Sequence, residues 1–339
     1  MKVLARFLAL FAIALASPVA AQSSFSNIYV YGDSLSDSGN AFLATRGEEA
    51  SPLDGYYEGR FSNGPNFADY ISSALTGTLA TPALLGGTNF AVGGATAATI
   101  SGTRSPSFIQ QIVASGALVS RNISPDALVI VNFSGNDVRR TINIGGPVQF
   151  DQATSSLFDG LGALYLAGAR NFVVTGTPNI GALPRSIDDV GSIPGRLEEL
   201  TQRSRKINFL FGKTSAEFAQ LTGSNVAFFD LFRFENALVA NPTRFGLPGD
   251  LNTTTPCQII GGGVPQISNC EGSLYFDRVH PTTAVHQVIA DGVLAQLNGT
   301  PLAVPEPATW LMMLIGFGVV GSRIRGSRVH SARLRALTF

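Results

Sequence analysis

The sequence of 339 residues contains three histidines, and their neighbours decide which of them is suited to act as a general base. Histidine is the side chain whose unperturbed pKa best matches proton transfer near neutral pH. His280 follows Asp277 by three residues, in a turn before Pro281 that can hold a carboxylate beside an imidazole. His286 falls within a helix that we predict from Pro281 to Leu297, and the third histidine lies in a basic tail. Taken alone, this turn favours a structural Asp and a capping His. An orienting carboxylate beside a base is the alternative, and the rest of the chain has to decide between them.

Transfer of an acyl group needs a hydroxyl nucleophile in addition to a base. Ser34 is a candidate nucleophile because it lies just after a predicted strand. The run from Ser26 to Gly32 is rich in β-branched and aromatic residues, which predicts a buried strand. Ser34 follows this run, so it would lie near a helix N-terminus, whose free backbone N–H groups can face an oxyanion. A plain strand-to-helix turn is the structural alternative. The chain contains no Gly-x-Ser-x-Gly segment, which removes the nucleophile elbow of α/β-hydrolases as a competitor.

Four segments of the chain, taken in order, resemble the sequence blocks of the GDSL family, also called SGNH hydrolases. They are Phe25 to Asn40, which contains Gly32-Asp33-Ser34-Leu35, then Asn89 to Gly94, Gly135 to Asp137, and Asp277 to His280. Each motif alone is weak, but their order and their placement after predicted strands make the resemblance specific. It covers roughly Phe25 to Leu297.

The resemblance implies a role for each matched residue. Ser34 would be the nucleophile, His280 the base that deprotonates it, and Asp277 the carboxylate that orients the imidazole. The oxyanion would be held by the backbone N–H groups of Ser34 and Gly94, the second glycine of its pair, and by the Asn136 amide. Turn glycines and a capping asparagine are the structural alternatives. A mechanism of this kind needs no metal and no organic cofactor.

Other charged residues near these blocks receive structural interpretations. Asp33 and Asp37 are expected to fix the conformation of the first block. Asp230 ends a predicted strand and is the rival candidate for orienting the base. Arg139 and Arg140 are interpreted as a solvated pair just past a loop, and steering of an anionic head group is the alternative.

Strand-like and helix-like segments alternate along the chain. Strand-like runs recur at Ala127 to Phe133, Asn171 to Thr175 and Val226 to Asp230, and helical spacing occurs in Phe67 to Leu75, Ala153 to Ala169 and Arg196 to Leu221. This alternation predicts an α/β fold with a parallel sheet covered on both faces and functional groups at the carboxyl ends of its strands. The family resemblance implies a three-layer α/β/α sandwich, the flavodoxin-like SGNH hydrolase fold, with about five strands. Gly, Pro, Thr and Asn dominate Pro242 to Gly272, which predicts a long loop.

The amino terminus has the pattern of a secretory signal peptide over residues 1–21. Two basic residues precede an apolar run from Phe7 to Ala16, and small residues then lead to an expected cleavage site after Ala21. An uncleaved membrane anchor is the alternative.

Export would place Cys257 and Cys270, the only two cysteines, in an oxidising compartment. This predicts a disulfide between them, with two unpaired thiols as the alternative.

A separate module follows the hydrolase domain, which we predict over residues 25–298. Val304-Pro305-Glu306-Pro307 leads into an apolar segment from Ala308 to Gly321, and three arginines follow by residue 328. This pattern resembles the PEP-CTERM sorting signal, over residues 304–328 with a basic tail to 339. The resemblance implies transient membrane insertion of the tail and cleavage by an exosortase. The protein would then reside in the cell envelope, on the surface or outside a Gram-negative bacterium, and a terminal anchor helix is the alternative.

Composition and charge narrow the function further. Hydrophobic residues make up 45% of the chain and charged residues 14%, so the chain can bury a full core. Between Gln22 and Val304, 22 acidic residues face 16 basic ones, which argues against a nucleic-acid partner. We therefore expect an exported serine ester hydrolase of the carboxylesterase or lipase type, processed by signal peptidase and exosortase. A carbohydrate O-deacetylase acting on extracellular polysaccharide is the runner-up, and a catalytically silent surface binding protein or a matrix component are the remaining alternatives.

Overall fold

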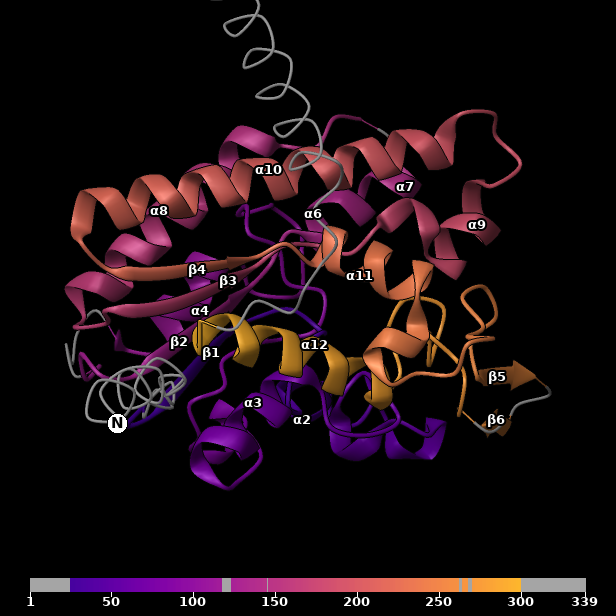
Figure 1. Ribbon diagram of the computed structural model, residues 1–339, viewed down its shortest axis with the longest axis horizontal. Helices are drawn as coiled ribbons and strands as arrows, with labels where there is room; N and C mark the ends of the chain where they lie inside the picture. Colours follow the sequence, from indigo (N-terminus) through magenta and orange to yellow (C-terminus); the bar gives the residue numbers. More distant parts are fainter. Residues whose placement is uncertain (1–24, 118–122, 145, 262–263, 268–269, 300–339) are drawn as a thin grey trace, which may run out of the picture. The chain divides into compact units, whose positions relative to one another are not determined.

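Four short strands form a parallel sheet in the order β1-β2-β3-β4 (Figure 1). Their bounds are β1 Ile28–Gly32, β2 Leu128–Asn132, β3 Asn171–Thr175 and β4 Asn225–Phe229. The register pairs Gly32 with Asn132, Asn132 with Thr175 and Thr175 with Phe229, so all four strands end at one edge of the sheet. The computed structural model describes residues 25–117, 123–144, 146–261, 264–267 and 270–299.

Helices cover both faces of the sheet (Figure 1). On one face α8 packs against both α4 and α10, and on the other α12 packs against α3. The helices are α2 Asn40–Ala44, α3 Phe67–Thr76, α4 Phe108–Ala114, α6 Gly135–Arg139, α7 Thr141–Ile144, α8 Phe150–Leu166, α9 Pro184–Val190, α10 Arg196–Thr222, α11 Leu231–Ala240 and α12 Thr283–Leu297. Short 3₁₀ helices are η1 Pro52–Asp54, η2 Tyr57–Gly59, η3 Ala83–Leu85, η4 Ile180–Ala182 and η5 Pro242–Phe245. The predicted three-layer α/β/α architecture is therefore confirmed.

The main sheet has four strands, one fewer than the expected number of about five. A fifth segment, residues 88–92, runs beside β1 and is linked to it by three backbone hydrogen bonds. Its pairing amounts to an isolated parallel bridge between Val30 and Asn89. The Asn89 amide donates to Ser36 O at 2.8 Å and to Ser38 Oγ at 2.7 Å, which ties this segment to the loop after β1. Next to β1, the place of a fifth strand is thus taken by a connecting segment that also contacts the loop after β1.

The stretch from Pro242 to Gly272 contains regular structure, although the sequence predicts a long loop. It opens with η5, and two strands, β5 Gln258–Gly261 and β6 Val264–Ile267, pair antiparallel within it. Each strand has only four residues and one contains Pro265, so no run of strand-forming residues reveals the hairpin. The predicted disulfide between Cys257 and Cys270 is confirmed, and its two cysteines flank this hairpin.

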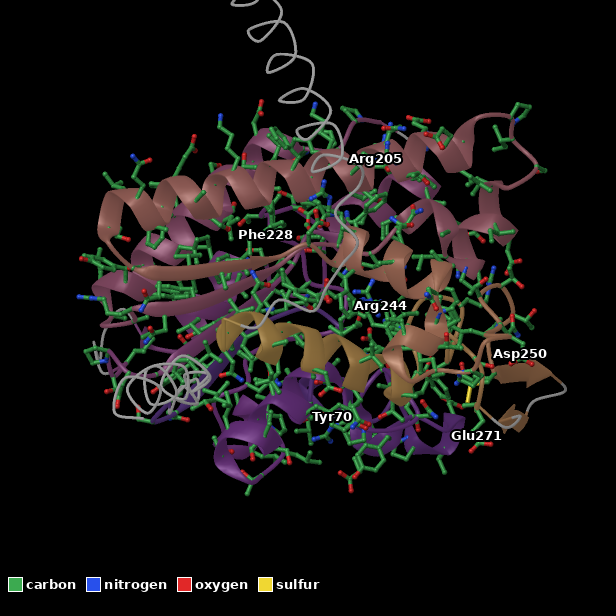
Figure 2. All side chains as sticks on the ribbon, viewed as in Figure 1. Tyr70, Arg205, Phe228, Arg244, Asp250 and Glu271 are labelled. Carbon is green, nitrogen blue, oxygen red and sulfur yellow. A yellow bond between two sulfur atoms is a disulfide. The ribbon has the colours of Figure 1, made fainter. Side chains whose placement is uncertain are left out.

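Local signals and side-chain contacts fix the layer formed by α3 and α12. A capping box starts α3, because the Asn66 side chain accepts from the Asp69 N–H and the Asp69 side chain accepts from the Asn66 N–H. Tyr70 of α3, labelled in Figure 2, forms a hydrogen bond of 2.8 Å with Thr283 Oγ1 at the start of α12. The turn from Asp277 to His280 immediately precedes α12, so these contacts anchor the helix next to it.

Candidate active site

The candidate nucleophile and its two partners converge beside the carboxyl edge of the sheet. His280 Nε2 lies 2.7 Å from Ser34 Oγ, and His280 Nδ1 lies 2.7 Å from Asp277 Oδ2. Ser34 stands two residues past β1, whereas Asp277 and His280 come from the turn before α12. Their exposed fractions are 8%, 9% and 9%, so the three residues are largely shielded from water yet still reachable. An imidazole placed between a hydroxyl and a carboxylate is the geometry of a serine triad.

The charge of His280 and hydrogen bonds to both oxygens of Asp277 favour the ionised form of this carboxyl. Oδ1 accepts from the backbone N–H groups of Val279 and His280, each at 2.7 Å, and Oδ2 accepts from the Tyr56 hydroxyl at 2.9 Å. Burial acts to raise the pKa of this carboxyl, but the charge of His280 and the hydrogen bonds outweigh it and hold the pKa below its usual value. In a neutral His280 the ionised Asp277 favours the tautomer with the proton on Nδ1, and Nε2 would then accept from Ser34.

Two aromatic residues of the site were missed by sequence reasoning. Tyr56 donates to Asp277, and the Phe61 ring lies against the His280 ring with centroids 5.0 Å apart. Both belong to a segment of short 3₁₀ turns that has no helix or strand periodicity. Tyr56 and Asp277 are 221 residues apart in the chain, so no local pattern could have predicted their contact.

The buried side chains of Asp33 and Asp37 fix the loop after β1 through hydrogen bonds to backbone N–H groups. Asp37 accepts four backbone N–H groups, and the donors are Gly39, Asn40, Ala41 and Gly93. Asp33 Oδ1 accepts from the Leu35 N–H at 3.0 Å, and burial raises the pKa of Asp33 to about 7. The predicted role of both residues in fixing this block is therefore confirmed by their hydrogen bonds.

Gly93 and Gly94 differ in what their backbone N–H groups can do. The Gly93 N–H donates to Asp37 Oδ2 at 2.9 Å, so it is not available to bind an oxyanion. Gly94 has a φ of +78°, in the left-handed region, and a Cβ on it would lie 2.7 Å from Ser105 Oγ. Within the described part of the chain, the N–H groups of Gly94 and Ser34 have no hydrogen-bond partner. Of the two glycines, Gly94 is therefore the one whose N–H group is available to a ligand.

Asn136 and Asp137 tie the start of α6 to the glycine loop, residues 93–98. Asn136 Nδ2 donates to Ala95 O at 2.9 Å, and Asp137 accepts two backbone N–H groups from the same loop at 2.9 and 3.0 Å. Ser134, just before this helix, has a φ of +94°, which is rare for a residue with a Cβ. This sharp turn out of β2 brings the Asn136 amide next to the loop that contains Gly94.

The interpretation of Arg139 as a solvated residue is wrong. Its Nε and Nη2 donate to Asn136 Oδ1 at 3.1 and 2.9 Å, so the guanidinium turns inward toward the site. Arg140, in contrast, forms no side-chain hydrogen bond within the described residues. Arg139 and Asn136 stand three residues apart on α6, and this helical spacing was the signal that could have revealed their contact.

The remaining candidates do not contact the base. His286 is 1% exposed, and its Nδ1 accepts from the Phe67 N–H at 3.3 Å. Burial lowers the pKa of His286 to about 3, so it is a neutral residue of the core and lies outside the catalytic group. Asp230 caps α11 by accepting from the Arg233 N–H at 3.0 Å, and the carboxylate that does contact His280 is Asp277.

A largely apolar cavity of about 390 Å³ lies beside the glycine loop and is lined by Ala41, Val92 and Gly93 among others, but by no triad residue. No group of three or more His, Cys, Asp or Glu residues in the described ranges is arranged to hold a metal ion.

Known proteins with similar sequences or structures include hydrolases and an acyltransferase. The thermolabile hemolysin of Vibrio parahaemolyticus is 27% identical over 298 residues, which cover 80% of this chain and 64% of that protein, just under two thirds of its length. The phosphatidylcholine-sterol acyltransferase of Aeromonas hydrophila is 25% identical over 318 residues, covering 79% and 89%. A solved structure of a putative arylesterase from Agrobacterium tumefaciens has a TM-score of 0.43 and 16% identity, covering 81% and 99%.

The PEP-CTERM protein-sorting motif matches residues 303–328, which confirms that resemblance and indicates export to the envelope of a Gram-negative bacterium. This motif, the apolar segment from Ala308 to Gly321 and the predicted signal peptide lie outside the described residues. Among the helices that are described, none has the length and apolar character needed to cross a membrane.

The larger part of the chain matches a single family. The sequence model of the GDSL-like lipase/acylhydrolase family matches residues 28–293, from the first residue of β1 into α12. This span contains all four strands of the parallel sheet and every residue of the Ser34, His280 and Asp277 arrangement. Sequence blocks, sheet and side-chain geometry agree over the same residues, and the chain belongs to the GDSL-like lipase/acylhydrolase family.

Proposed function

We propose that the protein is an exported serine ester hydrolase that forms an acyl-enzyme on Ser34. His280 Nε2 takes the proton of Ser34 Oγ as this oxygen attacks the ester carbonyl, and Asp277 stabilises the resulting imidazolium. The bond to the alcohol oxygen breaks as His280 gives the proton to that oxygen. Water, deprotonated by the same imidazole, then attacks the acyl group, and the acid leaves with Ser34 restored.

The observation that carries this proposal is the continuous pair of 2.7 Å hydrogen bonds from Ser34 through His280 to Asp277. A hydroxyl becomes a nucleophile at neutral pH when an adjacent base accepts its proton and a third group orients that base. The lowered pKa of Asp277 supports the orienting role, because the carboxylate stays charged at neutral pH.

Stabilisation of the oxyanion is assigned to three donors. The unpartnered N–H groups of Ser34 and Gly94 would donate to the carbonyl oxygen as it becomes negative. The Asn136 amide, held beside the same loop by Ala95, would be the third donor. Removal of one such donor lowers kcat by roughly 10²- to 10³-fold in serine hydrolases, so this group of donors is a major contribution to catalysis.

Acyl esters of lipids or simple alcohols are the substrate class that we propose. The relative from Aeromonas hydrophila is named for acyl transfer between phosphatidylcholine and a sterol, which favours an acyl ester as the substrate. An acetylated extracellular polysaccharide is the competing substrate, since a triad of this kind attacks either ester.

The decisive experiment compares hydrolysis of a chain-length series of nitrophenyl esters with release of acetate from an acetylated polysaccharide. The protein and its Ser34→Ala variant are assayed side by side, with circular dichroism to show that the variant folds. We expect turnover that depends on Ser34 and is highest on acyl esters. A higher kcat/KM on the polysaccharide would replace the lipase assignment by an O-deacetylase. The absence of turnover dependent on Ser34 on every ester would contradict the proposed function and favour a silent binding protein.

The maturation of the chain is a separate part of the proposal. Signal peptidase would remove residues 1–21, and an exosortase would cleave near Val304 to Pro307 after the tail inserts into the membrane. Intact mass of the protein from its native host tests both steps. A chain that still ends at Phe339 would contradict the proposed sorting.

A further inference from the structure

Arg139 lies one helical turn beyond Asn136 and directs its guanidinium at the Asn136 side chain. The Nε and Nη2 groups both donate to Asn136 Oδ1, at 3.1 and 2.9 Å. Two N–H groups on one acceptor hold that oxygen more firmly than a single donor, and the donors carry a full positive charge. The contact therefore constrains the one side chain that is assigned to the oxyanion.

The second end of the Asn136 amide is fixed as well. Its Nδ2 donates to Ala95 O at 2.9 Å. The Ala95 carbonyl can pair only with the amide nitrogen, and the Arg139 guanidinium can pair only with the amide oxygen. A flipped amide would place its NH₂ group against the guanidinium and its oxygen against a carbonyl. Because an amide nitrogen carries two hydrogens, one hydrogen remains for the oxyanion after the bond to Ala95 is made.

The charge of Arg139 adds to this geometric effect. The guanidinium is partly buried, and Asp33 and Asp277 are among the charged groups that act on it, with Arg140 and Arg185 acting in the opposite sense. Donation from a cation to Oδ1 withdraws electrons from the amide, which makes the opposite Nδ2–H a stronger donor. A fixed positive charge behind the donor also favours negative charge on the carbonyl oxygen of the substrate.

We propose that Arg139 is a positioning residue that locks the Asn136 amide in the orientation that donates to the oxyanion and strengthens this donor. The proposal rests on the proposed function, since it assigns Arg139 to the same reaction. Two other roles make different predictions. A structural residue of α6 would affect stability alone, and a residue that steers anionic substrates would affect KM for those substrates.

The test uses the full chain with Arg139→Gln, Arg139→Lys and, as the matched control, Arg140→Gln. On a neutral nitrophenyl ester we expect Arg139→Gln to lower kcat by roughly 10- to 100-fold with KM changed less than about threefold, because the donor acts in the transition state. Arg139→Lys should recover part of kcat, since it restores the charge without the two-pronged contact. Arg140→Gln should stay within about twofold of the unchanged protein.

A double-mutant cycle separates positioning from an independent effect. In an Asn136→Ala background, Arg139→Gln should cause no further loss of kcat, because the amide through which Arg139 acts is absent. The same comparison is made for binding of a boronic acid, which forms a tetrahedral anionic adduct with a serine nucleophile, and the same lack of additivity is expected. If Arg139→Gln does not fold, the cycle is run with Arg139→Lys, whose partial loss must likewise vanish in the Asn136→Ala background.

Three results would overturn the proposal. The first is an equal loss from Arg139→Gln with and without Asn136, and the second is an unchanged kcat in a folded Arg139→Gln protein. The third is a rise in KM confined to anionic esters, which would indicate steering. The Ser34→Ala variant keeps this test distinct from that of the proposed function. Turnover that depends on Ser34 but not on Arg139 contradicts only the positioning role, whereas turnover that is retained in Ser34→Ala contradicts the mechanism as a whole.

Discussion

At the scale of single residues, the buried carboxylate of Asp277 accepts a hydrogen bond from a tyrosine hydroxyl as well as from His280. Tyr56 donates to Oδ2, the same oxygen that accepts from the His280 ring. We predict that Tyr56→Phe lowers the free energy of unfolding by about 1 to 2 kcal/mol, because a hydrogen bond to a buried charged group is lost. The kcat/KM should fall less than about tenfold, since three other hydrogen bonds still hold the carboxylate.

The neighbouring Tyr57 supplies a matched control for this prediction. Its ring lies beneath the Arg60 guanidinium, with 5.5 Å between the guanidinium carbon and the ring centroid, and no hydrogen bond of its hydroxyl occurs within the described residues. Denaturant unfolding and ester hydrolysis are measured for Tyr56→Phe and Tyr57→Phe together. Equal effects of the two variants would show that the Tyr56 hydroxyl does not support Asp277.

The residues that sequence reasoning placed in the site are those that belong to short local motifs. Ser34 follows a recognisable strand, and the spacing of Asp277 and His280 is compatible with one turn, so their types and positions are informative. Tyr56, Phe61 and Arg139 were not predicted to contact the site. The first two reach it through tertiary packing. The third reaches it through helical spacing from Asn136, in a segment interpreted from the sequence as lying just past a loop.

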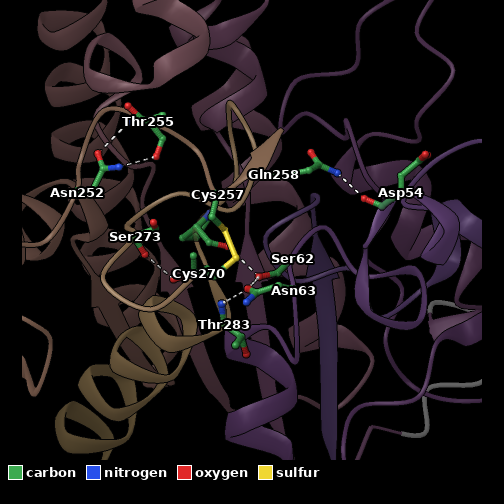
Figure 3. The surroundings of a disulfide bond; sticks show 12 residues. Asp54, Ser62, Asn63, Asn252, Thr255, Cys257, Gln258, Cys270, Ser273 and Thr283 are labelled. Carbon is green, nitrogen blue, oxygen red and sulfur yellow. Dashed lines mark hydrogen bonds between the residues drawn. A yellow bond between two sulfur atoms is a disulfide. The ribbon is translucent and has the colours of Figure 1, made fainter. Parts of the chain in front are cut away.

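At the scale of elements, the disulfide supports the segment that leads to the base. Cys257 N–H donates to Tyr275 O, and the Gln258 N–H donates to Phe276 O at 2.7 Å. Figure 3 shows Gln258 beside the disulfide, with its side chain directed to Asp54 O at 2.7 Å. The chain next to Cys257 thus contacts both the segment before Asp277 and the loop that carries Tyr56. The loop of Ser34 is held instead by Asp37.

We predict that reduction of the Cys257–Cys270 bond loosens the base before the protein unfolds. The bond closes a loop with a sequence separation of 13, and its loss should destabilise the fold by about 3 kcal/mol on the chain-entropy model. Displacement of His280 relative to Ser34 should lower kcat/KM by roughly tenfold, because catalysis depends on their alignment. Activity and far-ultraviolet circular dichroism are followed during reduction, with the double variant Cys257→Ser, Cys270→Ser as a control. Loss of both signals in parallel would refute this order of events.

The elements that sequence patterns predicted are those with enough residues to show a period. Strands β1 to β3 are fully or largely buried, and their continuous apolar runs gave bounds within one or two residues. The hairpin of β5 and β6 was missed because two four-residue strands carry too little pattern. Where a fifth strand was expected, the segment beside β1 forms only an isolated bridge, and the backbone of Asn89 pairs on its other side with Thr81 and Ala83.

At the scale of the whole molecule, one buried histidine links stability to pH. His286 belongs to α12 and contacts the start of α3, where its Nδ1 accepts from the Phe67 N–H. Its pKa is lowered by burial from 6.5 to about 3, so the unfolded chain takes up a proton before the folded protein does. Above pH 6.5 His286 is neutral in both the folded and the unfolded state and does not affect the free energy of unfolding. As the pH falls from 6.5 toward about 3, protonation of His286 in the unfolded chain lowers this free energy.

We predict that this group alone decreases the free energy of unfolding by up to about 1.4 kcal/mol per pH unit over that range. His286→Asn keeps an acceptor near the Phe67 N–H but does not titrate, so its stability should depend less steeply on pH below 6.5. Urea unfolding of both proteins between pH 4 and pH 8 measures the two slopes. Identical slopes would contradict a buried neutral His286.

The central claim is that the reaction passes through an acyl group on Ser34 Oγ, and peptide mass analysis after rapid acid quench tests it most directly. The protein is mixed with excess nitrophenyl ester, quenched, digested and compared with its Ser34→Ala variant. We predict an added acyl mass on the peptide that contains Ser34, none in the variant, and a loss of roughly 10³-fold or more in kcat/KM for a folded Ser34→Ala protein. An acyl group on another residue, or near-unchanged turnover by folded Ser34→Ala, would contradict the account.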